Sequence, residues 1–129
     1  MTVELSMLFW AVVLTFGQVI VAVLLALMQV GLPALAGNRD DVVETAMAGR
    51  AKRAHQNMLE NLILFAALVL IVQVAGLNNA NTALGAQIFV GARLAHAVIY
   101  LFGIPWLRTA VWAVSIVGLV MVALPIVMG

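Results

Sequence analysis

Hydrophobic and polar positions divide the chain into four long apolar runs separated by short polar segments. The first run, from Leu5 to Gln29, contains no charged residue. About 25 residues at a rise of 1.5 Å per residue make a helix of about 38 Å, enough to cross a hydrocarbon core of about 30 Å. The pattern predicts four such helices, at about residues 5–30, 42–74, 82–102 and 107–127.

The polar segments between the runs are short, which predicts how the helices are arranged. Residues 103–105, Gly-Ile-Pro, separate the third run from the fourth, and Asp40 or Asp41 is placed to cap the second helix. The first part of that helix, from Val42 to Lys52, should lie outside the hydrocarbon. Four helices with short connections predict an all-α, integral membrane four-helix bundle, a single domain over residues 1–129. Helix faces rich in Ala and Gly also predict close association between subunits.

The composition supports a membrane protein and excludes other classes. Hydrophobic residues make up 66% of the chain and charged residues 9%, against roughly 45–50% and 25% in soluble domains. The net charge is only +1, and no basic face is available for nucleic acid. No cysteine is present, so a thiol for any reaction must come from a ligand. The acidic start, Met1-Thr2-Val3-Glu4, argues against a cleaved signal peptide.

The basic residues predict the orientation in the membrane. Four of the six lie in or beside the first polar segment, namely Arg39, Arg50, Lys52 and Arg53. The second polar segment, residues 75–81, has none, so the first loop should face the cytoplasm and both termini the outside. We expect Arg50 and Lys52 to contact lipid headgroups. The third connection falls on the same side as the first, which brings Arg108 near the entrance of the second helix.

Two sets of polar residues recur at helical spacing inside the apolar runs. Arg53, Asn57 and Glu60 follow i, i+4 and i+7 spacing and therefore share one face of the second helix. A second set shares one face of the third helix, namely Arg93, His96 and Tyr100. Polar faces at membrane depth avoid lipid, so we expect these two to face each other or a wet pocket.

The charges of this cluster do not balance. In the simplest structural interpretation Glu60 pairs with Arg93 and merely fastens the bundle. Arg53, Arg93 and Arg108 together nevertheless carry three positive charges against the one negative charge of Glu60. An unmatched positive charge is costly in a membrane, so the surplus predicts an anionic ligand.

Histidine and tyrosine leave alternatives open, and a metal site is not expected. A lone histidine such as His96 is more often a hydrogen-bonded structural group than a ligand or base. Tyr100 suits a core aromatic and a hydroxyl donor equally well. His55 and His96 are the only histidines, and neither cysteine nor an H-E-x-x-H motif is present.

Two segments resemble the MAPEG family, the membrane-associated proteins of eicosanoid and glutathione metabolism. Residues 53–60, Arg-Ala-His-Gln-Asn-Met-Leu-Glu, are similar to the family's second-helix signature of Arg, Asn at +4 and Glu at +7. Residues 90–101 and 104–109 are similar to the third helix and fourth-helix entry of prostaglandin E synthase-like members. The resemblance implies a homotrimer that binds glutathione between subunits near the cytoplasmic end.

The same resemblance implies roles for individual residues. It implies that glutathione is bound by Arg53, Asn57, Glu60, Arg93, His96, Tyr100 and Thr109. It also implies a catalytic Arg108 at the sulfur, where it stabilises the thiolate. The expected activity is that of a glutathione-dependent transferase or peroxidase-like enzyme acting on a hydrophobic electrophile or lipid peroxide from the bilayer.

The chain departs from the family's pattern at three places. Some synthases carry basic residues at the end of the first helix, where this chain has Gln29 and two apolar neighbours, and Gln56 and Trp112 replace a basic residue and an aromatic hydroxyl. A non-catalytic protein of the same fold that binds a lipid or protein partner is therefore an alternative. A small ion conductor using Glu60, Arg93 and His96 is a third hypothesis. The compact loops favour a bacterial cytoplasmic membrane.

Overall fold

The chain folds into helices alone. The computed structural model describes residues 1–129, with helices α1 (Val3–Val30), α2 (Leu32–Ala36), α3 (Ala46–Ala75), α4 (Ala80–Phe102) and α5 (Pro105–Met128). All but α2 are long and apolar enough to cross a membrane. The prediction of an all-α protein with four membrane-spanning helices is confirmed.

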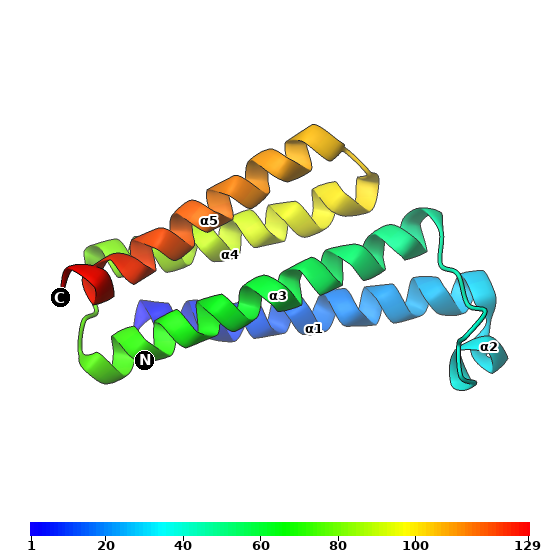
Figure 1. Cartoon of the computed structure of the whole chain (residues 1–129), viewed down its shortest axis with the longest axis horizontal. Helices are drawn as coiled ribbons and strands as arrows, with labels where there is room; N and C mark the ends of the chain where they lie inside the picture. The colour runs from blue at the N-terminus through cyan, green and yellow to red at the C-terminus, as the bar shows by residue number, and fades with distance from the viewer.

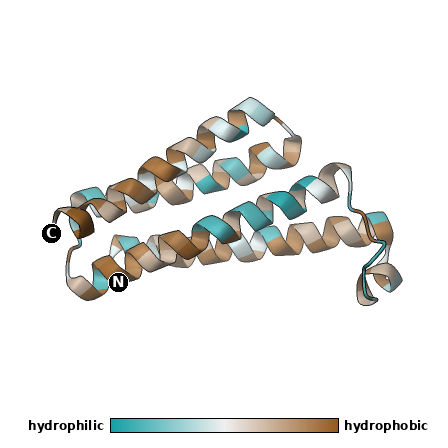
Figure 2. Ribbon diagram, in the orientation of Figure 1, coloured by the Kyte–Doolittle hydropathy of each residue, from teal (hydrophilic) through white to brown (hydrophobic).

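The four long helices form two antiparallel pairs (Figure 1). Helix α1 packs along α3, and α4 packs along α5. The pairs lie close together at the end that holds both termini and diverge toward the end that holds the α4–α5 turn. Polar residues cluster along the part of α3 that leads toward the diverging end, and a second, smaller set lies near the turn that joins α3 to α4 (Figure 2).

Glycines bring α4 and α5 into direct backbone contact. A Cβ atom added at Gly85 would lie 2.8 Å from the carbonyl oxygen of Gly118, and one added at Gly118 would lie 2.6 Å from the carbonyl oxygen of Gly85. Both distances are shorter than van der Waals contact, so no larger residue fits without separating the helices. Such close approach stabilises helix pairs in lipid, where the hydrophobic effect does not drive association.

The core between the two pairs is aromatic at its centre. The rings of Phe65 on α3 and Phe89 on α4 stack with centroids 4.1 Å apart and an interplanar angle of 17°. Both are fully buried, and the same cluster contains Met58, Val69, Val72 and Val122. A separate polar contact ties α1 to α4 near the termini, where the Thr82 hydroxyl donates to the buried carboxylate of Glu4.

The segment before α3 differs from the prediction. Helix α3 begins at Ala46 rather than near residue 42, and its N-cap is Thr45 rather than Asp40 or Asp41. The side chain of Gln29 explains the late start, because its Oε1 accepts from the Thr45 N–H (2.8 Å) and its Nε2 donates to the Thr45 carbonyl (3.0 Å). These bonds hold Thr45 extended against the end of α1. The short helix α2, with a proline in its first turn, was not expected.

Candidate functional site

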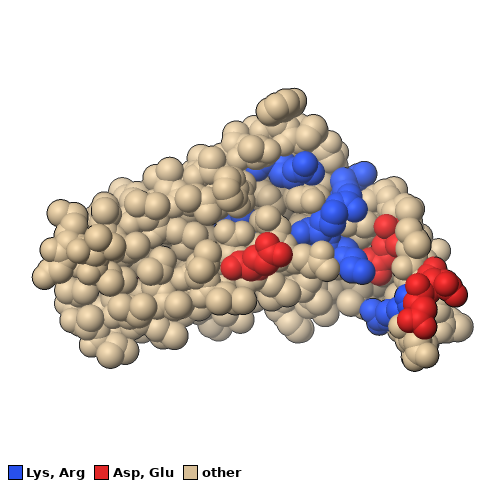
Figure 3. Space-filling model, in the orientation of Figure 1, with Lys and Arg blue, Asp and Glu red and all other residues tan.

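A polar cavity lies between α3, α4 and α5. Its volume is about 220 Å³, and it is lined by Asn57, His96, Tyr100, Arg108, Thr109 and Trp112. Figure 3 shows that the basic side chains gather in this half of the molecule, around the start of α3 and the α4–α5 turn. No acidic side chain lines the cavity.

Helical spacing brings the lining residues together. His96 and Tyr100 lie one turn apart on α4, and Arg108 and Trp112 lie one turn apart on α5. Helix α5 begins at Pro105, which suits a first helical position because it needs no N–H partner there, so Arg108 falls in the first turn. The Thr109 hydroxyl donates to the Pro105 carbonyl at 3.2 Å.

Arg93 does not line the cavity but lies buried next to Asn57, which does. Only 1% of its surface is exposed, and its Nη2 donates to the Asn57 Oδ1 at 2.6 Å. Its Nε and Nη1 atoms have no hydrogen-bond partner. The pairing of Arg93 with Glu60, considered from the sequence, is therefore wrong, because Glu60 is exposed on α3 and the guanidinium contacts an amide instead. A buried guanidinium with two free donors is costly unless an anion reaches it.

Arg108 contacts the ring of Tyr100, which in turn contacts the ring of His96. The guanidinium carbon of Arg108 lies 4.5 Å from the centroid of the Tyr100 ring, a cation–π distance. The His96 ring meets Tyr100 edge to face, with centroids 5.5 Å apart. His96 is 2% exposed, and its Nδ1 has no partner. No carboxylate lines the cavity around Arg108, so the cavity is electropositive.

The structure brings together most, but not all, of the predicted site residues. Five of the eight line the cavity, and Arg93 contacts it through Asn57. Arg53 and Glu60 do not line it; both are exposed on α3. Asn57 lines the cavity together with His96 and Arg108 of the same chain.

Comparison with known proteins gives the family. A model of the MAPEG family matches residues 7–128, nearly the whole chain. The chain belongs to the MAPEG family. Human microsomal glutathione S-transferase 1 is 39% identical over 66 residues, which are 51% of this chain and 39% of that protein. The rat protein of the same name is 38% identical over 56 residues, or 43% of this chain and 36% of that protein. The matched segments thus span under half of these relatives. No solved structure matches significantly.

Three contacts of this MAPEG chain were not predicted from the sequence, where Trp112 was noted only as a departure from the family's pattern. Trp112 lines the cavity, and the Asn61 side chain donates to the Asn57 carbonyl at 2.8 Å. Both lie four residues beyond a predicted site residue, Arg108 and Asn57 respectively, and that spacing was the available signal. Arg50, expected at the headgroups, instead donates from its Nε to the Leu101 carbonyl at 2.9 Å.

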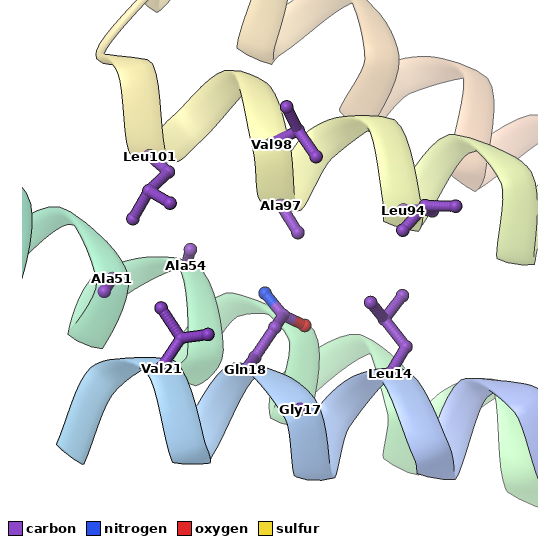
Figure 4. A pocket seen from close by; sticks show the side chains of 10 residues that line it. All are labelled: Leu14, Gly17, Gln18, Val21, Ala51, Ala54, Leu94, Ala97, Val98 and Leu101. Atoms are coloured by element: carbon purple, nitrogen blue, oxygen red, sulfur yellow. The ribbon is translucent and has the colours of Figure 1, made fainter. Parts of the chain in front are cut away.

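A second, apolar cavity lies on the other side of the α3–α4 contact (Figure 4). Its volume is about 280 Å³, and its ten lining residues come from α1, α3 and α4. They include Leu94 and Ala97 on α4, whereas the polar cavity takes His96 and Tyr100 from an adjoining face of that helix. Its only polar lining side chain is Gln18. With no charged or titratable group, it lacks the means for acid, base or thiolate chemistry, so the polar cavity is the candidate site of this MAPEG protein.

Proposed function

We propose that this protein is a membrane-bound, glutathione-dependent transferase or peroxidase-like enzyme that acts on a hydrophobic electrophile or lipid peroxide. The observation that carries the proposal is an electropositive cavity between membrane-spanning helices, lined by Arg108 and backed by the buried Arg93, with no acidic side chain. Its relatives in the MAPEG family include proteins named microsomal glutathione S-transferase 1.

The charge and donors of the cavity fit glutathione in its reactive form. Glutathione carries two carboxylates and one ammonium, so with its thiol ionised its net charge is −2. Arg93 and Arg108 supply two positive charges, and two nitrogen atoms of Arg93, Nε and Nη1, have no hydrogen-bond partner. Arginine remains protonated at any physiological pH, and its planar fork matches a carboxylate. An anion of this kind removes the cost of the buried guanidinium.

The size of the cavity favours a site completed by a second subunit. Pockets for drug-sized ligands have volumes of about 300–1,000 Å³, so a cavity of about 220 Å³ holds only part of a tripeptide. Arg53 and Glu60 are exposed on α3, on either side of Asn57 along the helix. Covering them with another copy, in a homotrimer, would let Arg53 bind a carboxylate and Glu60 the ammonium. It would also remove both charges from lipid.

Arg108 is the proposed catalytic residue. A free thiol has a pKa of about 8.5, and a neighbouring guanidinium lowers this value and raises the thiolate fraction. The thiolate attacks the electrophilic carbon of an aryl halide; a carbon–sulfur bond forms, and the halide leaves with the bond pair. With a lipid peroxide the thiolate attacks the terminal peroxide oxygen; a sulfur–oxygen bond forms to give the sulfenic acid, the O–O bond breaks, and the alkoxide leaves and is protonated to the lipid alcohol. A second glutathione then converts the sulfenic acid to the disulfide and water.

Glutathione binding tests the proposal first. Isothermal titration of the detergent-purified trimer with glutathione should give saturable binding below millimolar concentration. Ophthalmic acid, which has a methyl group in place of the thiol, is the matched ligand; it should bind more weakly because it cannot offer a thiolate to Arg108. Absence of binding at millimolar glutathione, with the trimer intact, would contradict the proposal.

A second candidate function is a non-catalytic membrane protein that keeps the fold and binds a lipid or protein partner. It is favoured by the end of α1, where Gln29 is hydrogen-bonded to Thr45 and no basic group extends from α1 to the site. The rate of conjugation of glutathione with chlorodinitrobenzene separates the two hypotheses, since only an enzyme releases chloride faster than the uncatalysed reaction does. Binding without conjugation would favour the second.

The proposed setting is a bacterial cytoplasmic membrane, with the α1–α3 loop in the cytoplasm and both termini outside. The basic residues around that loop support this orientation. Because the chain has no native cysteine, a single cysteine introduced at Val43, in the loop, can be labelled from one side only. An impermeant maleimide should react with it in inverted vesicles and not in intact cells.

A further inference from the structure

Arg50 links the start of α3 to the end of α4. Its Nε donates to the Leu101 carbonyl at 2.9 Å, across 51 positions of the sequence. The turn that follows Leu101 leads into α5 and its Arg108. The residue therefore touches the segment that connects two cavity-lining side chains, Tyr100 and Arg108, while it does not line the cavity itself.

The Leu101 carbonyl has no backbone partner available. In a continuing helix it would accept from the N–H of residue 105, but residue 105 is proline and has none. Two other late carbonyls of α4 are used by the turn, because the Gly103 N–H donates to Tyr100 (3.0 Å) and the Ile104 N–H to Ile99 (3.4 Å). Arg50 supplies the missing donor, and its positive charge also suits the negative end of the α4 dipole.

The turn is shaped to receive this side chain. Gly103 has φ +73°, in the left-handed region that favours glycine, and a Cβ added there would lie 3.3 Å from both the Cδ and the Nε of Arg50. The backbone of the turn thus packs directly on the guanidinium stem. A Cβ at position 103 would require the Arg50 side chain or the turn to shift by a few tenths of an ångström.

Two hydrogen bonds join α3 to α4, and they flank the cavity along α4. One comes from Arg93, before His96 and Tyr100, and ends on Asn57. The other comes from Arg50 and ends on Leu101, after Tyr100. The Arg50 bond therefore holds the α4–α5 turn against the start of α3 at this end of the molecule (Figure 1).

We propose that Arg50 is a positioning residue of the site. It docks the α4–α5 turn on α3 and so fixes Tyr100 and Arg108 opposite Asn57. The effect on catalysis rests on the function proposed above, whereas the docking itself does not. In this role Arg50 acts through the backbone of α4 and makes no contact with the thiol.

Three variants separate docking from simple charge. Arg50→Met keeps the length of the side chain and removes the donor; Arg50→Lys keeps a donor that can reach the carbonyl. Lys52→Met is the matched control, because Lys52 is a basic residue of the same helix, exposed and without a hydrogen bond.

The first readout is hydrogen–deuterium exchange of the peptide covering residues 101–108, which needs no ligand. Exchange should be faster in Arg50→Met and close to wild type in Arg50→Lys and Lys52→Met.

The second readout is functional. It consists of the rate of glutathione conjugation and of the ultraviolet absorbance of bound glutathione thiolate as a function of pH. Misplacing a catalytic group by about 1 Å lowers the rate by up to about 100-fold, so Arg50→Met should lower kcat by roughly tenfold or more. It should also raise the apparent pKa of the bound thiol, with a smaller change in KM.

Unchanged exchange in Arg50→Met, an equal loss of exchange protection or of kcat in Lys52→Met, or no rescue by Arg50→Lys would each overturn the proposal. If wild-type protein fails to bind glutathione, the proposed function fails, and the exchange data still decide whether Arg50 docks the turn.

Discussion

The guanidinium of Arg93 and the side-chain amide of Asn57 are joined by a 2.6 Å hydrogen bond between α4 and α3. No carboxylate takes part, and two further nitrogen atoms of Arg93, Nε and Nη1, are left without a partner. An interaction evolved only to fasten two helices would be expected to neutralise or satisfy the buried charge. The arrangement therefore fits a binding site, where the ligand brings the missing negative charge.

Replacing Arg93 should separate ligand binding from stability. Arg93→Met removes a buried charge without a counter-ion, so we expect the free energy of unfolding without ligand to change by no more than about 1 kcal/mol. The increase in thermal midpoint on adding glutathione should be lost, because binding to the folded state is its source. Thermal unfolding in detergent with and without glutathione measures both quantities. A large loss of stability without ligand, with the glutathione shift intact, would make Arg93 a purely structural residue.

The glycine contact between α4 and α5 should dominate the stability of that pair. Gly85→Leu places a side chain where the Gly118 carbonyl lies 2.8 Å from the Cβ position, and overpacking of this kind costs roughly 1–3 kcal/mol. Gly91→Leu is the control on the same helix, because no atom lies within 4 Å of its Cβ position. Thermal unfolding should show a lower midpoint for Gly85→Leu alone. Equal midpoints for the two variants would contradict the direct backbone contact.

The membrane-spanning helices were predictable because length and hydropathy decide them. An uncharged run of about 25 residues can satisfy its backbone in lipid only as a helix. The start of α3 was not predictable, because the bonds between Gln29 and Thr45 that delay it join residues 16 positions apart.

The site was predictable in part, through helical spacing. His96 and Tyr100 share a face, as their spacing requires, and both line the cavity. Spacing does not say where the buried face of a helix ends. Asn57 lies at the edge of the buried face of α3, so Arg53 and Glu60, within an arc of about 60°, fall on the exposed side. The contact of Arg50 with Leu101 depends on how the helix pairs pack, so no local sequence pattern predicts it.

Glutathione should bind to trimers and not to monomers. In the proposed site, Arg53 and Glu60 lie outside the cavity of about 220 Å³ and would complete it only when a second copy covers them. Native mass spectrometry from detergent resolves the oligomers and any bound glutathione. Arg53→Met should reduce the bound fraction in trimers, whereas the loop variant Arg39→Met should not. Monomers that carry glutathione at the same occupancy as trimers would contradict a shared site.

The most direct test of the account is thiolate formation at Arg108. Adding glutathione to the wild-type protein near neutral pH should produce the ultraviolet absorbance of a thiolate, because the guanidinium lowers the pKa of the bound thiol below its free value of about 8.5. Arg108→Met should abolish that absorbance while glutathione still binds, and the exposed-site variant Lys52→Met should retain it. The same thiolate absorbance in Arg108→Met as in wild type would contradict the claim that this cavity activates a thiol through Arg108.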